Sequence, residues 1–307
     1  TGSKNLVLAG GVALNCVGNG RILREGPFER IWIQPAAGDA GGALGAALFV
    51  WYQLLNNPRT PRTDLDGQEG SLLGPGYETE EVRRILDRCE AKYHYIADES
   101  ELINVVADAI ANEKVIGHMA GRMEFGPRAL GCRSIIGDAR SPKMQSVMNL
   151  KVKFRESFRP FAPCVLREHS PYMLLVAPVR EDKRIPLNGA GNDLFGIDKL
   201  KQLRSVVPAI THVDYSARVQ TVDPIRHTRM HKIMSRFKDK TGCPVIINTS
   251  FNVRSEPIVC SPSDAYRCFM ACNMDVLVVE NFVMYKEEQK QMSEEEIQEY
   301  LAQFQLD

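Results

Sequence analysis

Short apolar runs alternate with helical patterns over the first 55 residues. Asn5–Ala9 and Arg30–Gln34 are predicted strands, because each is a brief apolar run bounded by turn residues. Leu14–Glu25 and Asp39–Leu55 are predicted helices, and the small residues of the second predict close packing on a sheet. This β-α-β-α block has too few elements to bury both faces of a sheet, so residues 1–55 are interpreted as a piece of an α/β domain.

A linker rich in Pro and Gly, residues 56–78, separates this block from a second region, residues 79–287. Helices and strands follow one another there without strict alternation, which is typical of an α+β fold. The last segment, residues 288–307, is a predicted acidic helix that Ser293 and Glu296 would open with a capping box. The expected elements of the second region are helices at 79–91, 99–112, 225–240 and 261–272 and strands at 92–97, 114–119, 244–248 and 275–280.

The composition argues against several classes of protein. Lys plus Arg and Asp plus Glu each number 38, so the charge of the whole chain indicates no polyanionic partner. The chain has no stretch of about 18 apolar residues, and its N-terminus does not resemble a signal peptide. The 8 cysteines include no Cys-x-x-Cys pair, which is typical of reduced thiols in a cytosol. We therefore expect a cytoplasmic protein without membrane contact.

Arginine and glycine are interleaved in the segment Gly121–Arg140. Glycine lets the backbone come close to a ligand, and the forked guanidinium of arginine suits phosphate or carboxylate. Residues 121–167 hold ten Lys or Arg and three Asp or Glu, a surplus of seven positive charges. The segment therefore predicts an anion site, and the alternative is a basic surface loop that binds nothing.

Cationic and apolar residues alternate a little further along the chain. Lys151, Lys153 and Arg155 would share one face of a strand, because successive side chains of a strand point to opposite faces. Such a cationic face could meet an anionic ligand. By this motif alone, however, the favoured interpretation is the solvated face of an edge strand, where lysine discourages pairing with another chain.

Short polar side chains lie at the carboxyl end of the predicted buried strand 244–248. Asn248, Ser250 and Asn252 are near the edge where α/β sheets commonly hold a ligand. The same residue types also satisfy turns by bonding to the nearby backbone, so the pattern leaves both interpretations open.

Three further patterns are weaker. Gly10 and Gly11 follow a predicted strand and could cradle a phosphate, although a glycine pair alone is weak evidence. Asp39 begins a predicted helix and is best interpreted, by sequence alone, as its N-cap. His227 and His231 have the spacing of a metal-binding helix pair, but no third ligand lies nearby and basic residues surround them. We interpret both histidines as surface residues.

Together these motifs resemble those of one protein family. Across Leu6–Tyr285, and in the family's order, the chain contains GGVALN, AAGDAG, FGPRALG followed by RSI, FRPFAP, ARVQTV and NTSFN. On these motifs the chain is identified as a member of the O-carbamoyltransferases of antibiotic and nodulation-factor biosynthesis.

The resemblance implies two folds and two half-reactions. An actin-like ATPase α/β lobe, present here only in part, would transfer the carbamoyl group at Fe²⁺ or another divalent metal. A YrdC-like twisted-sheet α+β domain would form carbamoyl-AMP from ATP and from carbamate released by carbamoyl phosphate. Mg²⁺ would accompany the ATP. Family members extend further at the N-terminus, so we expect this chain to lack complete transfer activity toward a hydroxyl of a sugar, nodulation factor or antibiotic.

The resemblance also implies roles for individual residues. The residues expected to take part in adenylate formation are Arg128, Lys153, Arg159, Arg218 and Ser250. Those expected to contact the nucleotide or its phosphates are Gly10, Gly11, Asn15, Arg133, Asn248 and Asn252. Asp39, in AAGDAG, would be a metal ligand without the histidines that complete its site in the family.

A competing interpretation is a YrdC-like basic module that binds RNA without catalysis. The positive surplus between residues 121 and 167 would then contact phosphates of the nucleic-acid backbone. Few aromatic residues are interleaved with these charges, which argues against single-stranded nucleic acid as the partner.

Overall fold

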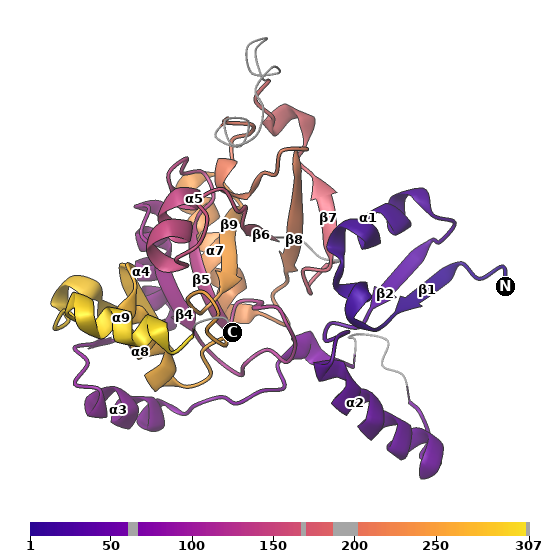
Figure 1. Cartoon of the computed structure of the whole chain (residues 1–307), viewed down its shortest axis with the longest axis horizontal. Coiled ribbons are helices and arrows are strands. Elements are labelled where there is room, and N and C mark those ends of the chain that lie inside the picture. The colour runs from indigo at the N-terminus through magenta and orange to yellow at the C-terminus, as the bar shows by residue number, and fades with distance from the viewer. Residues whose placement is uncertain (61–66, 167–169, 187–201, 305–307) are drawn as a thin grey trace.

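The chain forms a small N-terminal part and a larger part built around a wide sheet (Figure 1). The computed structural model describes residues 1–60, 67–166, 170–186 and 202–304. Residues 61–66 of the predicted linker and residues 305–307 of the predicted C-terminal helical segment lie outside the described residues.

In the N-terminal part, a helix connects two parallel strands. Strands β1 (Asn5–Leu8) and β2 (Arg30–Ile33) pair in parallel, and α1 (Cys16–Glu25) joins them. Helix α1 also contacts the larger part. The Nδ2 of Asn19 donates to the carbonyl of Leu174 at 3.1 Å. These elements agree with the predicted β-α-β pattern.

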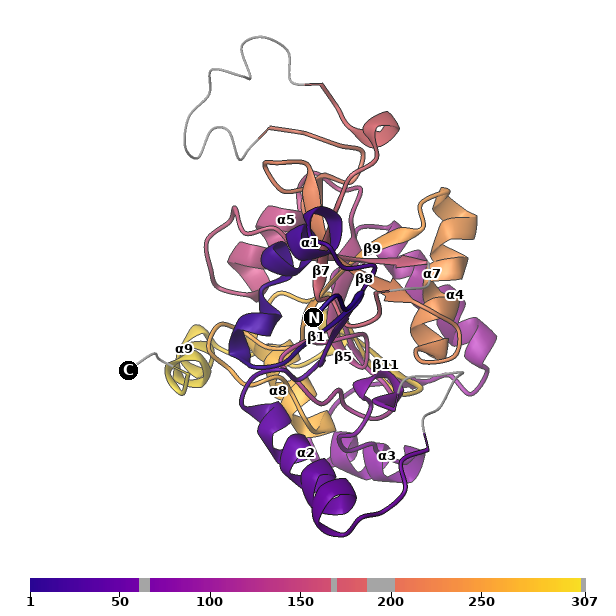
Figure 2. The same ribbon diagram turned by 90° about the vertical axis from the view of Figure 1, so that its right-hand side faces the viewer.

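Helix α2 (Ala40–Phe49) does not pack on a sheet, contrary to prediction. None of its residues is buried, and Figures 1 and 2 show the helix projecting from the rest of the molecule. The apolar sequence continues into a π-helical turn at Val50–Leu54, where the side chain of Trp51 is 52 % exposed. A sheet of only two strands offers too little surface to bury such a helix.

The larger part contains a nine-stranded mixed sheet in the order β3-β11-β10-β4-β5-β9-β6-β8-β7. The pairs β10–β4 and β6–β8 are parallel, and the other neighbours are antiparallel. The strands are β3 (His94–Tyr95), β4 (Ile116–Met119), β5 (Arg133–Asp138), β6 (Ala162–Leu166), β7 (Leu175–Pro178), β8 (Ser216–Val222), β9 (Val245–Ser250), β10 (Val276–Val279) and β11 (Phe282–Tyr285). The mixed pairing confirms the α+β class.

Helices cover both faces of this sheet (Figure 2). Helices α4 (Glu99–Ala111) and α7 (Thr228–Thr241) bury their apolar sides in the core of one face. The opposite face carries α3 (Thr79–Arg88), α5 (Met144–Val147), α8 (Pro262–Ala271) and α9 (Glu294–Ala302). The predicted capping box of Ser293 and Glu296 at the start of α9 is confirmed. None of the described helices is long and apolar enough to cross a membrane.

Several single turns complete the described structure. The 3-10 turns are Gly11–Leu14, Glu69–Ser71, Glu181–Lys183, Pro208–Ile210 and Lys286–Glu288, and a second π-helical turn covers Met148–Val152.

Residues 148–152 form that helical turn in place of the predicted strand. The amide of Lys153 donates to the carbonyl of Met148 at 2.8 Å, which closes the turn. In a helical turn, side chains two positions apart do not share a face. Lys151 is accordingly exposed while Lys153 is buried, so the predicted common face does not exist.

Candidate anion-binding site

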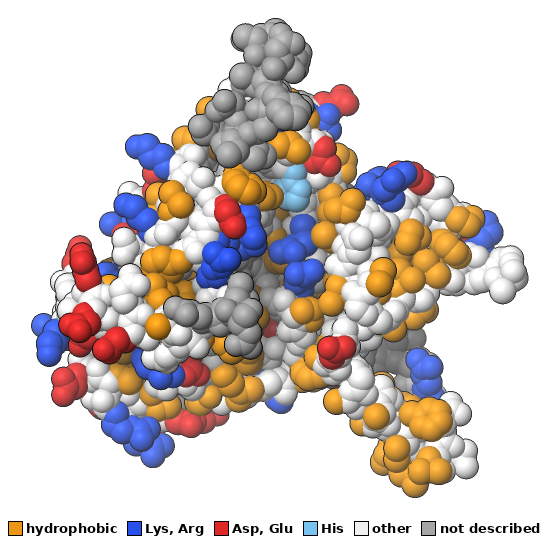
Figure 3. Space-filling view, viewed as in Figure 1, with side chains coloured by type: hydrophobic (Ala, Val, Ile, Leu, Met, Phe, Trp, Pro, Cys, Tyr) orange, Lys and Arg blue, Asp and Glu red, His pale blue; other side chains and the backbone are white. Residues whose placement is uncertain are grey.

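A cavity of about 390 Å³ lies where the N-terminal part meets the larger sheet. Four arginines line it, and Lys and Arg side chains gather in the central hollow of the face shown in Figure 3. Cys16, the first residue of α1, lines one side, so the partially positive end of that helix lies at the cavity. The other lining residues are Pro127, Arg128, Ala129, Arg155, Arg159, Pro160, Phe161, Ala162, Met173, His212, Arg218, Thr249 and Ser250.

Arg128 and Arg218 bring uncompensated positive charge to this cavity. Among the residues that the structure describes, neither guanidinium forms an ion pair, and the Nε of each is buried without a hydrogen-bond partner. Arg128 donates one long hydrogen bond of 3.4 Å, from Nη2 to the carbonyl of Leu14. Burial, followed by repulsion from Arg128, lowers the pKa of Arg218 to about 10. Buried donors in this state favour an anionic ligand.

Arg155 and Arg159 extend the cationic wall. Burial and the charge of Arg159 lower the pKa of Arg155, whose Nε donates to Oδ1 of Asn149 at 2.6 Å. The guanidinium of Arg155 also lies over the ring of Phe161, 5.0 Å from its centre. Arg159 is more exposed and pairs with Glu156 at 2.9 Å. Arg155 is not among the predicted site residues, although it stands in the same alternating cationic segment as Lys153.

Lys153 lies in an adjoining cavity of about 170 Å³ that shares Arg155, Arg159 and Ser250 with the first. Its ammonium donates to the carbonyls of Ser250 and Asn252 at 2.6 and 2.8 Å, and to Oδ1 of Asn252 at 2.6 Å. Burial lowers the pKa of Lys153 to about 7, while these oxygens stabilise its charged form. Lys153 therefore holds the turn that places Ser250 at the cavity.

Asn248 lies behind the cavity wall and does not line it. Its Nδ2 donates to Oε1 of Gln220 at 2.7 Å and to the carbonyl of Ala129 at 3.3 Å. Gln220 in turn donates to the carbonyl of Leu130 at 2.5 Å. These bonds tie the segment that carries Arg128 to the central strands.

Arg133 does not reach the cavity either. It is fully buried at the start of β5, and its guanidinium donates to backbone carbonyls. The acceptors are Cys132 at 2.8 Å, Gly121 at 3.1 Å and Pro75 at 3.1 Å. Arg133 therefore joins Pro75, in the segment before α3, to Gly121, at the start of the segment rich in glycine and arginine.

The predicted residues of the N-terminal part lie outside the cavity lining. Gly10 and Gly11 are exposed, and Asn15 caps α1 by accepting from the amide of Gly18 at 3.0 Å. Asp39 is exposed and stands at the N-cap position of α2, as interpreted, but its side chain makes no capping hydrogen bond. The described residues contain no group of three His, Cys, Asp or Glu that could hold a metal, so Asp39 has no co-ligands among them.

His227 is buried, contrary to the prediction that it lies at the surface. The 3-10 turn Glu69–Ser71 lies against it, and a side chain on Gly70 would come within 3.3 Å of its ring. Burial lowers the pKa of His227 to about 4, so the ring is neutral near pH 7. The sequence could not show that a distant segment covers this position.

Besides Arg155, the polar cavity residues outside the predicted set are Cys16, His212 and Thr249. Thr249 carried a usable signal, because it lies between Asn248 and Ser250 at the end of a predicted strand. His212 stands in no motif, and burial lowers its pKa.

The fold and the cavity define an α+β protein with an arginine-lined cavity. Residues 107–286 match the family model described as carbamoyltransferase C-terminus, and residues 1–48 match that described as carbamoyltransferase N-terminus. The chain therefore belongs to the carbamoyltransferase family.

Relatives with curated sequences agree with this assignment. The chain is 57 % identical, over 100 % of its length, to an uncharacterised protein of Synechocystis sp., of which it covers 51 %. It is 40 % identical over 93 % of its length to nodulation protein NolO of Bradyrhizobium diazoefficiens, of which it covers 50 %. It is 31 % identical over 87 % of its length to nodulation protein U of Rhizobium fredii, of which it covers 41 %. The chain thus spans about half the length of the curated relatives it matches.

Proposed function

We propose that this chain carries the carbamoyl-adenylate-forming site of an ATP-dependent O-carbamoyltransferase. In this proposal the large mixed sheet is a YrdC-like domain, and the N-terminal part belongs to an actin-like lobe. The observation that supports it most is that two guanidinium groups without a described carboxylate partner, those of Arg128 and Arg218, line one cavity. A site with this much positive charge and no described carboxylate facing Arg218 suits several phosphate groups at once.

The proposed reaction joins two anions that repel each other. Water first hydrolyses carbamoyl phosphate, which breaks its bond between the carbamoyl group and the phosphate and gives carbamate and inorganic phosphate. A carbamate oxygen then attacks the α-phosphorus of ATP, the bond to the β-phosphate breaks, and pyrophosphate leaves with the electron pair. Arg128, Arg155 and Arg218 would hold the anions together and neutralise the charge that develops on pyrophosphate. No side-chain nucleophile is needed.

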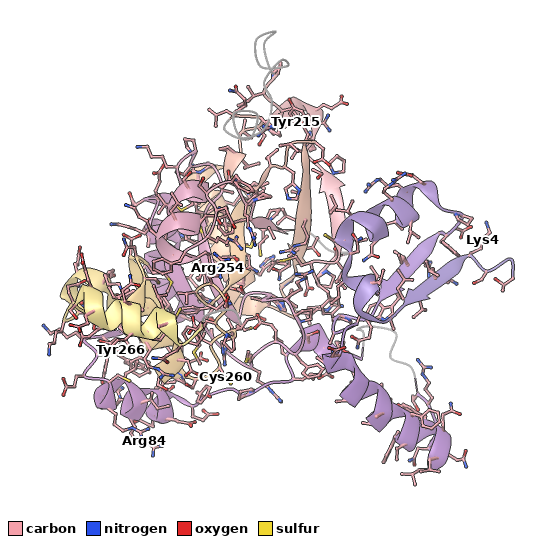
Figure 4. All side chains as sticks on the ribbon, viewed as in Figure 1. Lys4, Arg84, Tyr215, Arg254, Cys260 and Tyr266 are labelled. Atoms are coloured by element: carbon pink, nitrogen blue, oxygen red, sulfur yellow. The ribbon has the colours of Figure 1, made fainter. Side chains whose placement is uncertain are left out.

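Ser250 and Asn252 would shape the end of the site. The hydroxyl of Ser250 donates to Oδ1 of Asn252 at 2.6 Å, and Ser250 lines both cavities. Arg254, which is labelled in Figure 4, lines the smaller cavity beside them. Because the described residues offer no cluster of metal ligands, Mg²⁺ would be held mainly by the phosphates of ATP.

The later transfer to a hydroxyl of a sugar, nodulation factor or antibiotic would belong to the actin-like domain. Asp39 would contribute there to a site for Fe²⁺ or another divalent metal. The residues described here supply no partners for it, so no step of that transfer is assigned to them.

Titration calorimetry with pyrophosphate and with Mg-ATP tests the adenylation site directly. We expect binding to the wild-type chain and weaker binding to Arg218→Met, which keeps most of the side-chain volume. Exchange of labelled pyrophosphate into ATP, dependent on carbamoyl phosphate, would then establish the chemistry. Absence of binding at millimolar concentration contradicts the proposal, and tight, salt-sensitive RNA binding that pyrophosphate does not displace would favour the RNA-binding interpretation.

A further inference from the structure

The C-terminal helix α9 reaches the interior of the domain through one hydroxyl group. Tyr300 is only 7 % exposed, and its hydroxyl donates a hydrogen bond to Oε1 of Glu256. Glu256 is itself only 8 % exposed. A buried carboxylate needs hydrogen-bond donors, so Tyr300 is one of the groups that fix its position.

Glu256 closes the turn that follows strand β9. Its Oε2 accepts from the amide of Val253 at 2.7 Å, and its backbone carbonyl accepts from Nδ2 of Asn252 at 2.6 Å. The other end of the same amide, Oδ1 of Asn252, accepts from Lys153 and from Ser250, each at 2.6 Å. Glu256 thereby fixes which way the Asn252 amide points, and the amide fixes Lys153 and Ser250.

These contacts link α9 to the anion site through hydrogen bonds and, at Glu256, through the turn that joins its carboxylate to its backbone carbonyl. The residues involved come from four segments: α9, the turn after β9, the end of β9 itself, and the helical turn before Lys153. Removing the Tyr300 hydroxyl would leave a buried carboxylate oxygen without its donor. With the carboxylate no longer held by Tyr300, its bond to the amide of Val253 would loosen, and with it the turn whose Glu256 carbonyl holds the Asn252 amide.

We propose that Tyr300 is a positioning residue, which holds Lys153 and Ser250 in place through Glu256 and Asn252. The catalytic consequence rests on the proposed adenylation function, whereas the geometric consequence does not. Helix α9 thus helps to hold the site in shape, although Tyr300 does not line either cavity. Tyr300 also lies outside the residues matched by the carbamoyltransferase C-terminus model.

The geometric consequence is tested by amine labelling of Tyr300→Phe, with peptide mass spectrometry to resolve each lysine. In the wild type, the buried Lys153 should label far more slowly than the exposed Lys151. Loss of the hydroxyl should raise labelling of Lys153 by roughly two- to tenfold, the range for one lost hydrogen bond. Lys151, as an internal reference, should be unchanged.

Tyr266→Phe is the matched control. Tyr266, labelled in Figure 4, lies on the neighbouring helix α8, and its hydroxyl donates to Gln289 at 3.1 Å. This substitution also removes one tyrosine hydroxyl bond from the same side of the domain, but it leaves Glu256 untouched. Labelling of Lys153 should therefore stay at the wild-type rate.

The catalytic consequence is tested by pyrophosphate exchange. We expect Tyr300→Phe to lower kcat by roughly two- to tenfold and to change the KM for ATP by much less, because Arg128 and Arg218 lie on other segments. A lower melting temperature with unchanged Lys153 labelling and unchanged kcat would show a purely structural role and overturn the inference. If the wild type catalyses no exchange but Lys153 labelling still rises in Tyr300→Phe, the adenylation proposal fails while the positioning role stands.

Discussion

Arg218 and Arg128 come from separate segments of the chain, line the same cavity and repel each other. Burial, and then the charge of Arg128, lowers the pKa of Arg218 to about 10. Among the described residues no carboxylate pairs with either guanidinium, so nothing there offsets their mutual repulsion, and a bound anion would relieve it. Such an arrangement favours ligand affinity at the expense of the stability of the free protein.

Replacing Arg218 by Met should therefore stabilise the free protein and weaken anion binding. We expect the free energy of unfolding to rise by on the order of 1 kcal/mol, a discounted figure because one pKa unit corresponds to about 1.4 kcal/mol and solvent screens part of it. Pyrophosphate affinity should fall by about ten- to a hundredfold, since a charge-assisted hydrogen bond contributes about 1.5–3 kcal/mol. Denaturant unfolding and titration calorimetry measure the two effects.

Arg180→Met serves as the control for that substitution. Arg180 is exposed, pairs with Asp182 at 3.0 Å and does not line the arginine cavity, so both quantities should stay at the wild-type values. A clear loss of stability in Arg218→Met would instead mean that Arg218 holds the fold together.

Arg159→Ala should weaken pyrophosphate binding less than Arg128→Ala does. The Arg159 side chain is 54 % exposed and already paired with Glu156, so water screens its charge more effectively. We expect a loss of about threefold, compared with tenfold or more for Arg128. Lys151→Ala, which removes an exposed charge nearby, should leave affinity unchanged in the same titration. Equal losses for all three variants would indicate a diffuse basic surface in place of a defined site.

Short motifs predicted much of the site, because the residues that face the cavity stand together in the sequence. Arg128 lies in FGPRALG, Arg159 in FRPFAP and Ser250 in NTSFN, and the structure brings them together with Arg218 at one cavity. Local composition indicated an anion site only in Gly121–Arg140. The roles of Arg159, Arg218 and Ser250 came from the resemblance to the family, because their own patterns left a solvated strand face or a turn open.

Positions that depend on tertiary contacts could not be predicted in the same way. The alternation around Lys153 is only a few residues long, which is too short to distinguish a strand from a helical turn. Strand β5 was not predicted, because arginine and glycine are poor indicators of a buried strand. In the structure the carbonyls of Gly121 and Pro75 accept hydrogen bonds from the buried guanidinium of Arg133, which makes its burial possible. The burial of His227 likewise depends on a segment far away in the sequence.

The chain alone should not retain a stoichiometric transition metal. Asp39 is exposed, and the described residues hold no group of three potential metal ligands. We expect less than about one-tenth of an equivalent of iron or zinc after dialysis against a chelator, because structural sites in proteins commonly need about four ligands. Elemental mass spectrometry measures this directly. Retention of metal that Asp39→Ala abolishes would contradict the prediction and place a site in this chain.

The pH dependence of stability should report the burial of Lys153. Its pKa falls from the ordinary 10.5 to about 7 on folding. Between these two values the unfolded state binds a proton that the folded state has released, so the free energy of unfolding rises with pH, by at most about 1.4 kcal/mol per unit. Below pH 7 both states hold the proton, and this contribution to the slope disappears.

Lys153→Met should therefore remove part of this rise. Between pH 7 and pH 9 we expect the wild type to gain about 1–2 kcal/mol more than the variant, measured by urea unfolding at each pH. Burial also lowers the pKa of Lys286, to about 8, but that contribution is common to both proteins and cancels in the comparison. Lys151→Met, at an exposed position, should follow the wild-type curve. Equal slopes for wild type and Lys153→Met would mean that the oxygens of Ser250 and Asn252 keep the ammonium charged up to pH 9, outweighing its burial.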